Sequence, residues 1–109
     1  MTTLLFVYGT LKSGHKNNSL LSDGELLGNH LTEPCYTMYD LGLFPAITLN
    51  GDTAIHGEVW CVPDLVLTDY LEGYPTFYDR TLIHTVYGEA WVYYLSSANY
   101  EVIESGVWK

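Results

Sequence analysis

Short apolar runs separated by glycine, proline and polar residues dominate the chain, a pattern typical of a small, sheet-rich fold. Residues 4–8 are too few and too continuously apolar for a helix, and they predict a buried strand. Residues 78–86 and 90–95 predict two more strands, joined by a turn at residues 87–89. Between residues 25 and 40 the pattern is irregular, and we expect a strand only near residues 35–39.

The middle of the chain predicts a hairpin. Residues 44–48 predict a strand or an edge segment, because Pro45 has no N–H to donate to a ladder. Asn50-Gly51-Asp52 is a strong hairpin signal that leads into a strand at residues 55–62. Within that strand a period of two places Ile55, Val59 and Cys61 on one face. Gly57 in the same strand predicts a bulge or a close approach of backbone or ligand.

One convincing helix is expected after this strand. Pro63 suits the first turn of a helix, and Asp64 favours its positive end. Leu67 and Leu71 are four residues apart and predict an apolar stripe that faces the sheet. Gly73 suits a residue of positive φ that ends the helix.

The fold class follows from many short strands and little helix. A short helical turn is expected at residues 17–21, with Leu20 and Leu21 packed inward, and Trp108 near the end of the chain is expected to dock as an aromatic anchor. Together the elements predict an α+β fold, a small closed or half-closed sheet with a flanking helix. At 109 residues we expect a single domain, residues 1–109, with a real hydrophobic core.

Charge narrows the possible partners. The formal net charge is −9, from 13 acidic and 4 basic residues, which argues against nonspecific nucleic-acid binding and against anionic membranes. No apolar stretch approaches the roughly 18 residues of a membrane span, and the N-terminus does not resemble a signal peptide. We therefore expect a soluble, cytoplasmic protein that binds a small molecule.

The cysteines and histidines do not show the spacing of a redox or metal site. Cys35 and Cys61 lie in apolar patterns without C-x-x-C spacing, and we expect two buried free thiols. No nucleophile signature such as G-x-S-x-G is present. No cofactor or metal is expected, because none of the four histidines has ligand spacing: His15, His30, His56 and His84.

The loop after the first strand is the first candidate site. Gly9 and Thr10 follow Tyr8, where the chain leaves the sheet and several backbone N–H groups lose their ladder partners. Successive N–H groups that point inward form an anion-binding nest. An ordinary glycine-containing turn is the alternative, since the pattern has neither a P-loop Lys-Ser/Thr nor a G-x-G-x-x-G.

Glu72 is the second candidate. It lies at the negative end of the predicted helix, and many of its neighbours in sequence are aromatic. Both features would raise the pKa of its carboxyl toward the range of a general base at neutral pH. The alternatives are a solvated carboxylate or, with Asp69, the acid pair of a glycosidase. Arg80 is expected to pair with an acidic neighbour or a substrate carboxylate, and Tyr78 belongs either to the core or to the pocket wall.

Taken together, the chain resembles the gamma-glutamylcyclotransferase-like family, most closely its gamma-glutamylamine cyclotransferase branch. The resemblance covers nearly the whole chain and rests on the order of several weak motifs: Tyr8-Gly9-Thr10-Leu11, Phe44-Pro45-Ala46, Gly57-Glu58-Val59, Asp69 to Gly73, Tyr78-x-Arg80 and Ser105-Gly106-x-Trp108. One departure is the segment at residues 15–18, which is less basic than the family pattern.

The resemblance implies a small mixed β-barrel with one or two short flanking helices. It implies that Tyr8, Gly9, Thr10 and Leu11 bind a gamma-glutamyl group, and that Glu72 acts as the acid/base that cyclises this group to 5-oxoproline. We add Tyr78 as a wall of the pocket and expect Glu72 and the Gly9 loop to open onto one cavity. The rival hypothesis is a non-catalytic protein that senses or sequesters a small anionic ligand. The leaving amine and the oligomeric state are left open.

Overall fold

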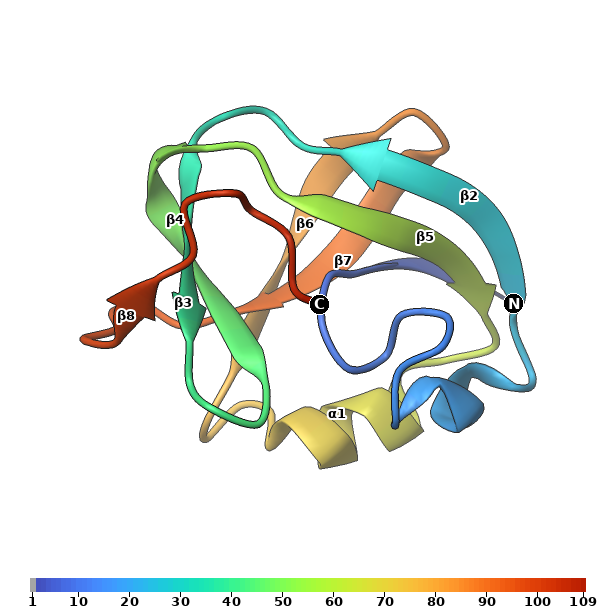
Figure 1. Ribbon diagram of the computed structural model, residues 1–109. Helices are drawn as coiled ribbons and strands as arrows, with labels where there is room; N and C mark the ends of the chain where they lie inside the picture. Colours follow the sequence, from blue (N-terminus) through green and yellow to red (C-terminus); the bar gives the residue numbers. More distant parts are fainter. Residues whose placement is uncertain (1) are drawn as a thin grey trace.

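The computed structural model describes residues 2–109, and its strands form two sheets flanked by two short helices (Figure 1). In chain order the elements are β1 (Thr3–Val7), the 3-10 helix η1 (Asn18–Leu21), β2 (Glu25–Leu31), β3 (Tyr36–Asp40), β4 (Pro45–Thr53), β5 (His56–Val62), α1 (Val66–Glu72), β6 (Asp79–Thr85), β7 (Gly88–Tyr94) and β8 (Glu101–Val102). The predicted α+β class is confirmed.

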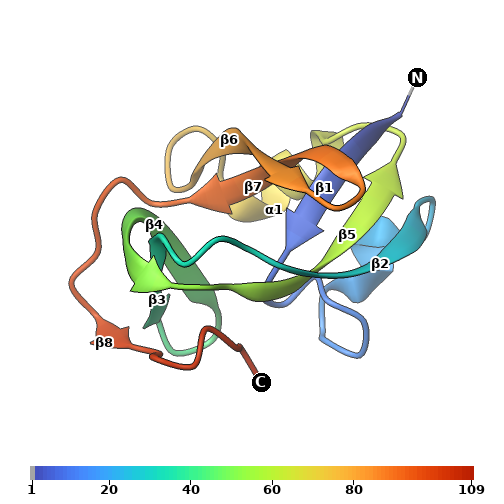
Figure 2. The same cartoon turned by 90° about the horizontal axis from the view of Figure 1, so that it is seen from above.

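The larger sheet has the order β2-β5-β1-β7-β6 and is mixed, since β1 pairs antiparallel with β5 but parallel with β7. The smaller sheet has the order β4-β3-β8. Figure 2 shows the two sheets side by side, with the C-terminal tail running past the smaller one. The N–H of Leu95 donates to the carbonyl of Ile47 at 2.9 Å and links them, although no ladder within residues 2–109 closes the strands into one barrel.

β1 is the central strand of the core, which explains its unbroken apolar sequence. Leu5 and Val7 belong to one buried cluster, while Phe6 and Tyr8 belong to another. Successive residues of a strand point to opposite faces, so a strand that is buried on both faces needs apolar residues at every position. The strand therefore ends, at Val7, between the two halves of the core.

Gly57 in β5 packs directly against this central strand. A Cβ atom at this position would overlap the carbonyl oxygen of Val7 and lie 2.6 Å from the ring of Phe6. The close approach predicted from Gly57 is confirmed. The predicted face of β5 is confirmed for Ile55 and Val59, which are fully buried, whereas Cys61 is half-buried.

The hairpin predicted at Asn50-Gly51-Asp52 is wrong. β4 continues through these residues to Thr53, and it pairs with β3 rather than with β5. The register shifts abruptly between Tyr36 and Thr37, and the extra residues of β4 form a bulge there. Gly51 has a φ of 140°, so the positive φ that the Asn-Gly pair favours is present but bends a strand instead of reversing the chain.

β2 is a strand that the sequence pattern did not reveal. It pairs with β5 along the edge of the larger sheet and contains a bulge between Leu26 and Gly28. Most of its residues are exposed or half-buried, so its apolar residues do not alternate regularly. An edge strand with little buried surface produces only a weak periodic signal.

The helix ends as predicted but packs on a different face. At its end, Gly73 adopts a left-handed conformation with a φ of 65°, as predicted. The helix begins at Val66, so Pro63 precedes its first turn instead of belonging to it. Leu67 and Leu71 do not face the sheet, because they are 55% and 38% exposed. The residue that α1 buries is Thr68. No helix within residues 2–109 is long and apolar enough to cross a membrane.

The expectation of two buried thiols is wrong for one cysteine. Both cysteines are free, but Cys35 is exposed and Cys61 is half-buried. Cys35 precedes β3 instead of lying within it, so it has no place on the buried face of that strand. The aromatic anchor expected at the end of the chain is present, since Trp108 packs against the cluster that contains Phe6.

Gly57→Ala tests the packing of β5 on β1. The added methyl group has no space, so we expect the free energy of unfolding to fall by about 1–3 kcal/mol. Denaturant unfolding measures the change, with His56→Ala as the control at the exposed neighbouring position. Equal stability of the Gly57→Ala variant and the control would contradict the close packing.

Candidate functional site

The loop after β1 turns three consecutive carbonyl groups toward the protein. The carbonyl oxygens of Gly9, Thr10 and Leu11 each accept a hydrogen bond. Their donors are, in the same order, the N–H of Lys12 at 3.1 Å, the N–H of Asn17 at 3.0 Å and Nδ2 of Asn18 at 2.8 Å. Each carbonyl is therefore fixed in direction, and with it the plane of its peptide group.

The N–H groups of the same three residues are unpaired. Within residues 2–109, the N–H groups of Gly9, Thr10 and Leu11 donate to no protein acceptor. All three residues line one pocket. Consecutive N–H groups without a protein partner form the kind of nest that binds an anion.

Two other segments hold this loop in place. Oε1 of Glu58 on β5 accepts hydrogen bonds from the N–H of Ser13 at 2.8 Å, from Oγ of Ser13 at 3.2 Å and from Nε1 of Trp60 at 3.1 Å. Nζ of Lys12 donates to the carbonyl of Trp108 at 2.7 Å. The strand next to β1 and the C-terminal tail therefore both fix the loop.

Glycine is required at position 9 because Pro45 lies against it. A Cβ atom on Gly9 would lie 2.8 Å from the ring of Pro45. The carbonyl of Pro45 in turn accepts a hydrogen bond from the hydroxyl of Tyr78 at 2.5 Å. These contacts join the loop, the start of β4 and the segment after α1 around one space.

Two buried tyrosines form the walls of this space. Tyr78 is 4% exposed, and the hydroxyl of Tyr8 donates to the backbone carbonyl of Tyr93 at 2.8 Å. Burial raises the pKa of both Tyr8 and Tyr78 well above the usual tyrosine value, so both hydroxyls stay protonated. Each is a fixed donor to a backbone carbonyl and is poorly suited to proton transfer.

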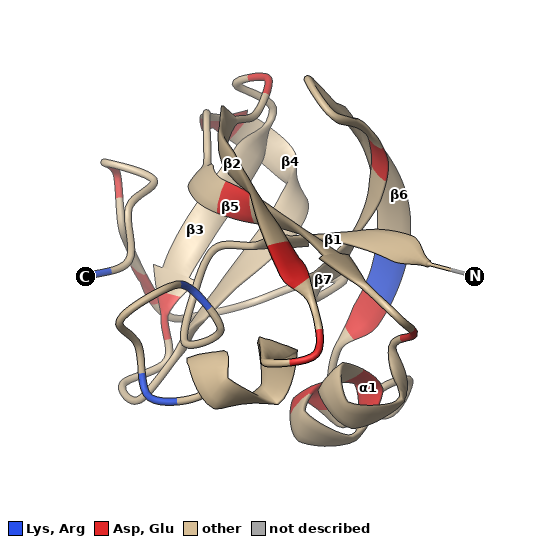
Figure 3. Ribbon diagram, turned by 90° about the vertical axis from the view of Figure 1, so that its right-hand side faces the viewer, with Lys and Arg blue, Asp and Glu red and all other residues tan. Residues whose placement is uncertain are grey.

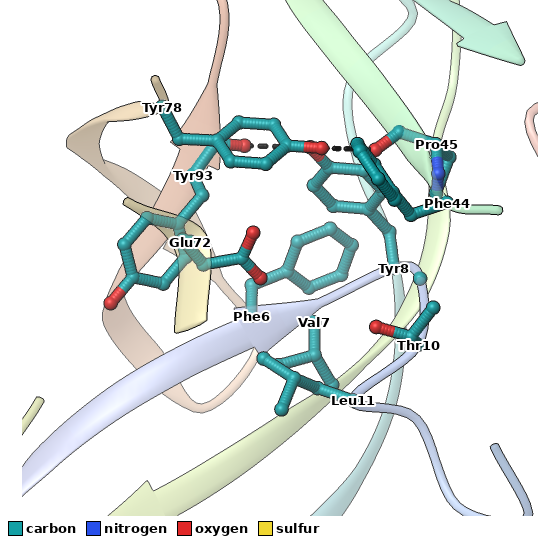
Figure 4. A pocket seen from close by; sticks show the side chains of 11 residues that line it. Phe6, Val7, Tyr8, Thr10, Leu11, Phe44, Pro45, Glu72, Tyr78 and Tyr93 are labelled. Atoms are coloured by element: carbon teal, nitrogen blue, oxygen red, sulfur yellow. Dashed lines mark hydrogen bonds between the residues drawn. The ribbon is translucent and has the colours of Figure 1, made fainter. Parts of the chain in front are cut away.

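Glu72, the last residue of α1, directs its carboxylate into the same pocket (Figure 4). Burial among mostly apolar neighbours raises the pKa of this carboxyl from 4.5 to about 7. The structure thus brings together all six residues singled out in the sequence: Tyr8, Gly9, Thr10, Leu11, Glu72 and Tyr78. Sequence analysis missed other lining residues, among them Tyr93, which no local motif marks.

The pocket is narrow at its inner end and opens outward. The inner cavity, of about 30 Å³, has space for little more than a water molecule. A groove of about 300 Å³ lies next to it and shares four of its lining residues, which are Thr10, Phe44, Glu72 and Tyr78. A ligand larger than a few atoms must therefore extend from the inner cavity into the groove.

A half-buried ionic network anchors the helix that carries Glu72. Asp69 accepts hydrogen bonds from Nε of Arg80 at 2.9 Å, from Nη2 of Arg80 at 3.2 Å and from the hydroxyl of Tyr93 at 2.6 Å. The guanidinium group also stacks on Tyr74 at 4.3 Å and on Trp91 at 4.5 Å. The expected pairing of Arg80 with an acidic residue is confirmed.

This network separates the two carboxylates of α1. Asp69 is bound to Arg80 and Tyr93 and does not line the pocket that contains Glu72. The alternative of a glycosidase acid pair therefore has no geometric support, because its two carboxylates must face the same bond. Within residues 2–109 no group of three His, Cys, Asp or Glu residues is arranged to hold a metal ion.

Comparison with known proteins identifies the family of the chain. The family model described as "Gamma-glutamyl cyclotransferase, AIG2-like" matches residues 5–109. The chain belongs to this family. The resemblance to the gamma-glutamylcyclotransferase-like family that the sequence indicated is therefore confirmed.

Individual relatives support the same assignment. A Vibrio cholerae protein with the provisional name gamma-glutamylcyclotransferase is 40% identical over 99% of this chain and 96% of its own. The solution structure of ytfP from Escherichia coli is 34% identical, with a TM-score of 0.74, and the match covers 97% of this chain and 96% of that one. An AIG2-like protein from mouse shares the fold at 23% identity, with a TM-score of 0.78 over 89% and 80% of the two chains.

The raised pKa of Glu72 predicts a specific pH dependence of stability. Between pH 4.5 and about 7 the folded protein binds a proton that the unfolded chain has released, so this carboxyl lowers stability as the pH rises through that range. The loss amounts to about 3 kcal/mol at pH 8. Glu72→Gln should remove it and be more stable than the parent protein at pH 8, with a difference that shrinks toward pH 4.5.

Denaturant unfolding of both proteins at pH 5, 6, 7 and 8 measures this difference. Glu104→Gln is the matched control, because Glu104 is an exposed carboxylate near the end of the chain. A constant difference between Glu72→Gln and the parent protein across the series would show that Glu72 titrates as an ordinary surface carboxylate.

Proposed function

We propose that this protein is a gamma-glutamyl cyclotransferase that releases an amine from a gamma-glutamyl amine or a similar small molecule by forming 5-oxoproline. Family membership supports gamma-glutamyl chemistry in general. The observation that carries the specific proposal is the pairing of one half-buried carboxyl, Glu72, with three unpaired N–H groups in a single pocket.

The amide nest would bind the anionic end of the substrate. In this proposal the N–H groups of Gly9, Thr10 and Leu11 bind the α-carboxylate of the gamma-glutamyl group, while Tyr8 and Tyr78 form the walls. The nest provides local positive potential in a protein whose formal net charge is −9. Because backbone N–H groups bind this carboxylate, Glu72 is left free for chemistry. Its pKa lies near neutrality.

Glu72 would transfer protons in both halves of the reaction. Its carboxylate accepts a proton from the α-ammonium group of the substrate, and the freed nitrogen attacks the γ-carbonyl carbon. A C–N bond forms and closes the five-membered ring. Collapse of the tetrahedral intermediate breaks the bond to the leaving nitrogen, which takes the proton back from Glu72 and departs as an amine, while the ring nitrogen loses its second proton to solvent.

Orientation would supply much of the rate acceleration. The attack is intramolecular, so holding the α-nitrogen near the γ-carbonyl replaces a diffusive encounter with a bound geometry. The steps balance without an added nucleophile, oxidant or reductant. The side chains that form the walls need only hold the substrate in a conformation close to that of the five-membered ring.

Glu72→Gln tests the role of the carboxyl. Removing an acid/base group should lower the rate of 5-oxoproline release by at least about 100-fold, while the uncharged side chain keeps the shape of the pocket. Chromatographic assay of 5-oxoproline measures turnover, and calorimetry measures substrate binding, which should persist. Full activity of the variant would exclude the mechanism, and binding without turnover by the parent protein would support the rival hypothesis of a sensing or sequestering protein.

The proposed base also predicts a pH profile. Only the deprotonated carboxylate can accept the substrate proton, so kcat/KM should rise as the pH increases through about 7 and then level off. Initial rates between pH 5.5 and 8.5 give the profile. A rate that is already maximal at pH 5.5 would mean that the group doing the chemistry has an ordinary carboxyl pKa.

A further inference from the structure

The groove next to Glu72 is chemically unlike the inner cavity. Apolar side chains dominate its walls and belong to three segments: Leu43 and Phe44 before β4, Leu71 on α1, and Phe77 after α1. Its apolar residues are unusually open to solvent, since Leu43 is 73% exposed and Phe77 is 48% exposed. Exposed apolar side chains beside a binding pocket are typical of a surface that a ligand covers.

Aromatic contacts hold one wall of this groove rigidly. Phe77 packs edge-on against Tyr78 with ring centroids 4.9 Å apart, and against Phe44 at 6.1 Å. In the turn between β3 and β4, the carboxylate of Asp40 accepts a hydrogen bond from the N–H of Gly42 at 2.7 Å, and the N–H of Leu41 donates to the carbonyl of Phe44. The turn that carries Leu43 is therefore fixed beside the groove before any ligand binds.

The groove also contains a lysine that no other part of the described chain engages. The Lys and Arg residues are few among many acidic ones, as Figure 3 shows. Lys12 binds the carbonyl of Trp108, and Arg80 binds Asp69. Lys109 is the last residue, and only Lys16 lines the groove. Within residues 2–109 no protein acceptor is recorded for the Lys16 side chain.

We propose that this groove is a specificity subsite that binds the leaving group of the substrate, and that Lys16 and the apolar side chains of Leu43 and Phe77 select an amine with an apolar body and a carboxylate. The inference rests on the proposed function. It assigns the substrate class to gamma-glutamyl conjugates of apolar amino acids, and it predicts discrimination against conjugates of diamines.

The position of Glu72 supports this division of the pocket. Glu72 lines both the inner cavity and the groove, so a bond cleaved beside its carboxyl would leave the nest-bound end of the glutamyl part in the cavity and the departing amine in the groove. A leaving group with a second ammonium would bring a positive charge toward Lys16, which is unfavourable. An apolar side chain on the leaving group would instead cover Leu43 and Phe77 and remove their surface from water.

Three gamma-glutamyl substrates separate these contributions. The gamma-glutamyl conjugate of leucine has both the apolar body and the carboxylate, and that of isopentylamine lacks only the carboxylate. That of 1,5-diaminopentane lacks the carboxylate and has an ammonium at the far end of its alkyl chain. We expect kcat/KM to fall in this order. Equal rates for all three, or the reverse order, would overturn the inference while leaving the proposed function intact.

Single substitutions test which residues cause the preference among the three conjugates. Lys16→Gln should lower kcat/KM for the leucine conjugate by about fivefold and leave the isopentylamine conjugate unchanged, since an exposed ion pair contributes at most about 1 kcal/mol. Lys109→Gln is the matched control. Leu43→Ser should slow both apolar conjugates, and Val86→Ser is its control because Val86 is similarly exposed, at 76%, in the turn between β6 and β7.

The test separates failure of the groove from failure of the proposed function. If the parent protein releases no 5-oxoproline from any substrate, the proposed function fails, and calorimetric titration with the same three conjugates still measures the preference. Tighter binding of the leucine conjugate that depends on Lys16 would support the subsite. Binding that is the same for all three conjugates would overturn it.

Discussion

The direction of three consecutive peptide groups after β1 is the constraint on which the pocket depends. Each carbonyl of Gly9, Thr10 and Leu11 is held by a donor further along the chain, and each N–H is left without a partner among residues 2–109. A buried backbone N–H without an acceptor is costly, so the loop is stable in this form only if water or a ligand satisfies those groups. The packing of Gly9 against Pro45 and the bonds from Ser13 to Glu58 keep the loop from relaxing into an ordinary turn.

Glu72 has a matching energetic cost. A carboxyl whose pKa is raised to about 7 by burial destabilises the folded protein at neutral pH, and a solvated position would avoid that loss. The interactions that keep it in place lie one turn earlier in α1, where Asp69 binds both Arg80 and Tyr93. The helix is thus fixed by an ionic pair while its last residue has a raised pKa, an arrangement typical of functional sites.

Local patterns predicted the parts of the fold whose cause is local. The unbroken apolar run of β1 reflects burial on both faces, and Gly73 ends α1 because only a residue that tolerates positive φ suits that position. The Asn50-Gly51 pair does impose a positive φ, but the predicted hairpin failed because β4 pairs with β3. Leu67 and Leu71 have the spacing of a buried stripe but are exposed, and Leu71 lines the groove.

The sequence by itself determined the composition of the site: a glycine-containing loop after an apolar strand, and a glutamate before a helix-ending glycine, in a chain of formal net charge −9. Tertiary structure alone decided that residues more than sixty positions apart share one cavity, that Asp69 faces Arg80 rather than Glu72, and that Lys16 lies on the groove. The reason is physical. Periodicity and turn chemistry act over a few residues, whereas the unpaired N–H groups and the raised pKa of Glu72 arise from desolvation, which depends on segments distant in the chain.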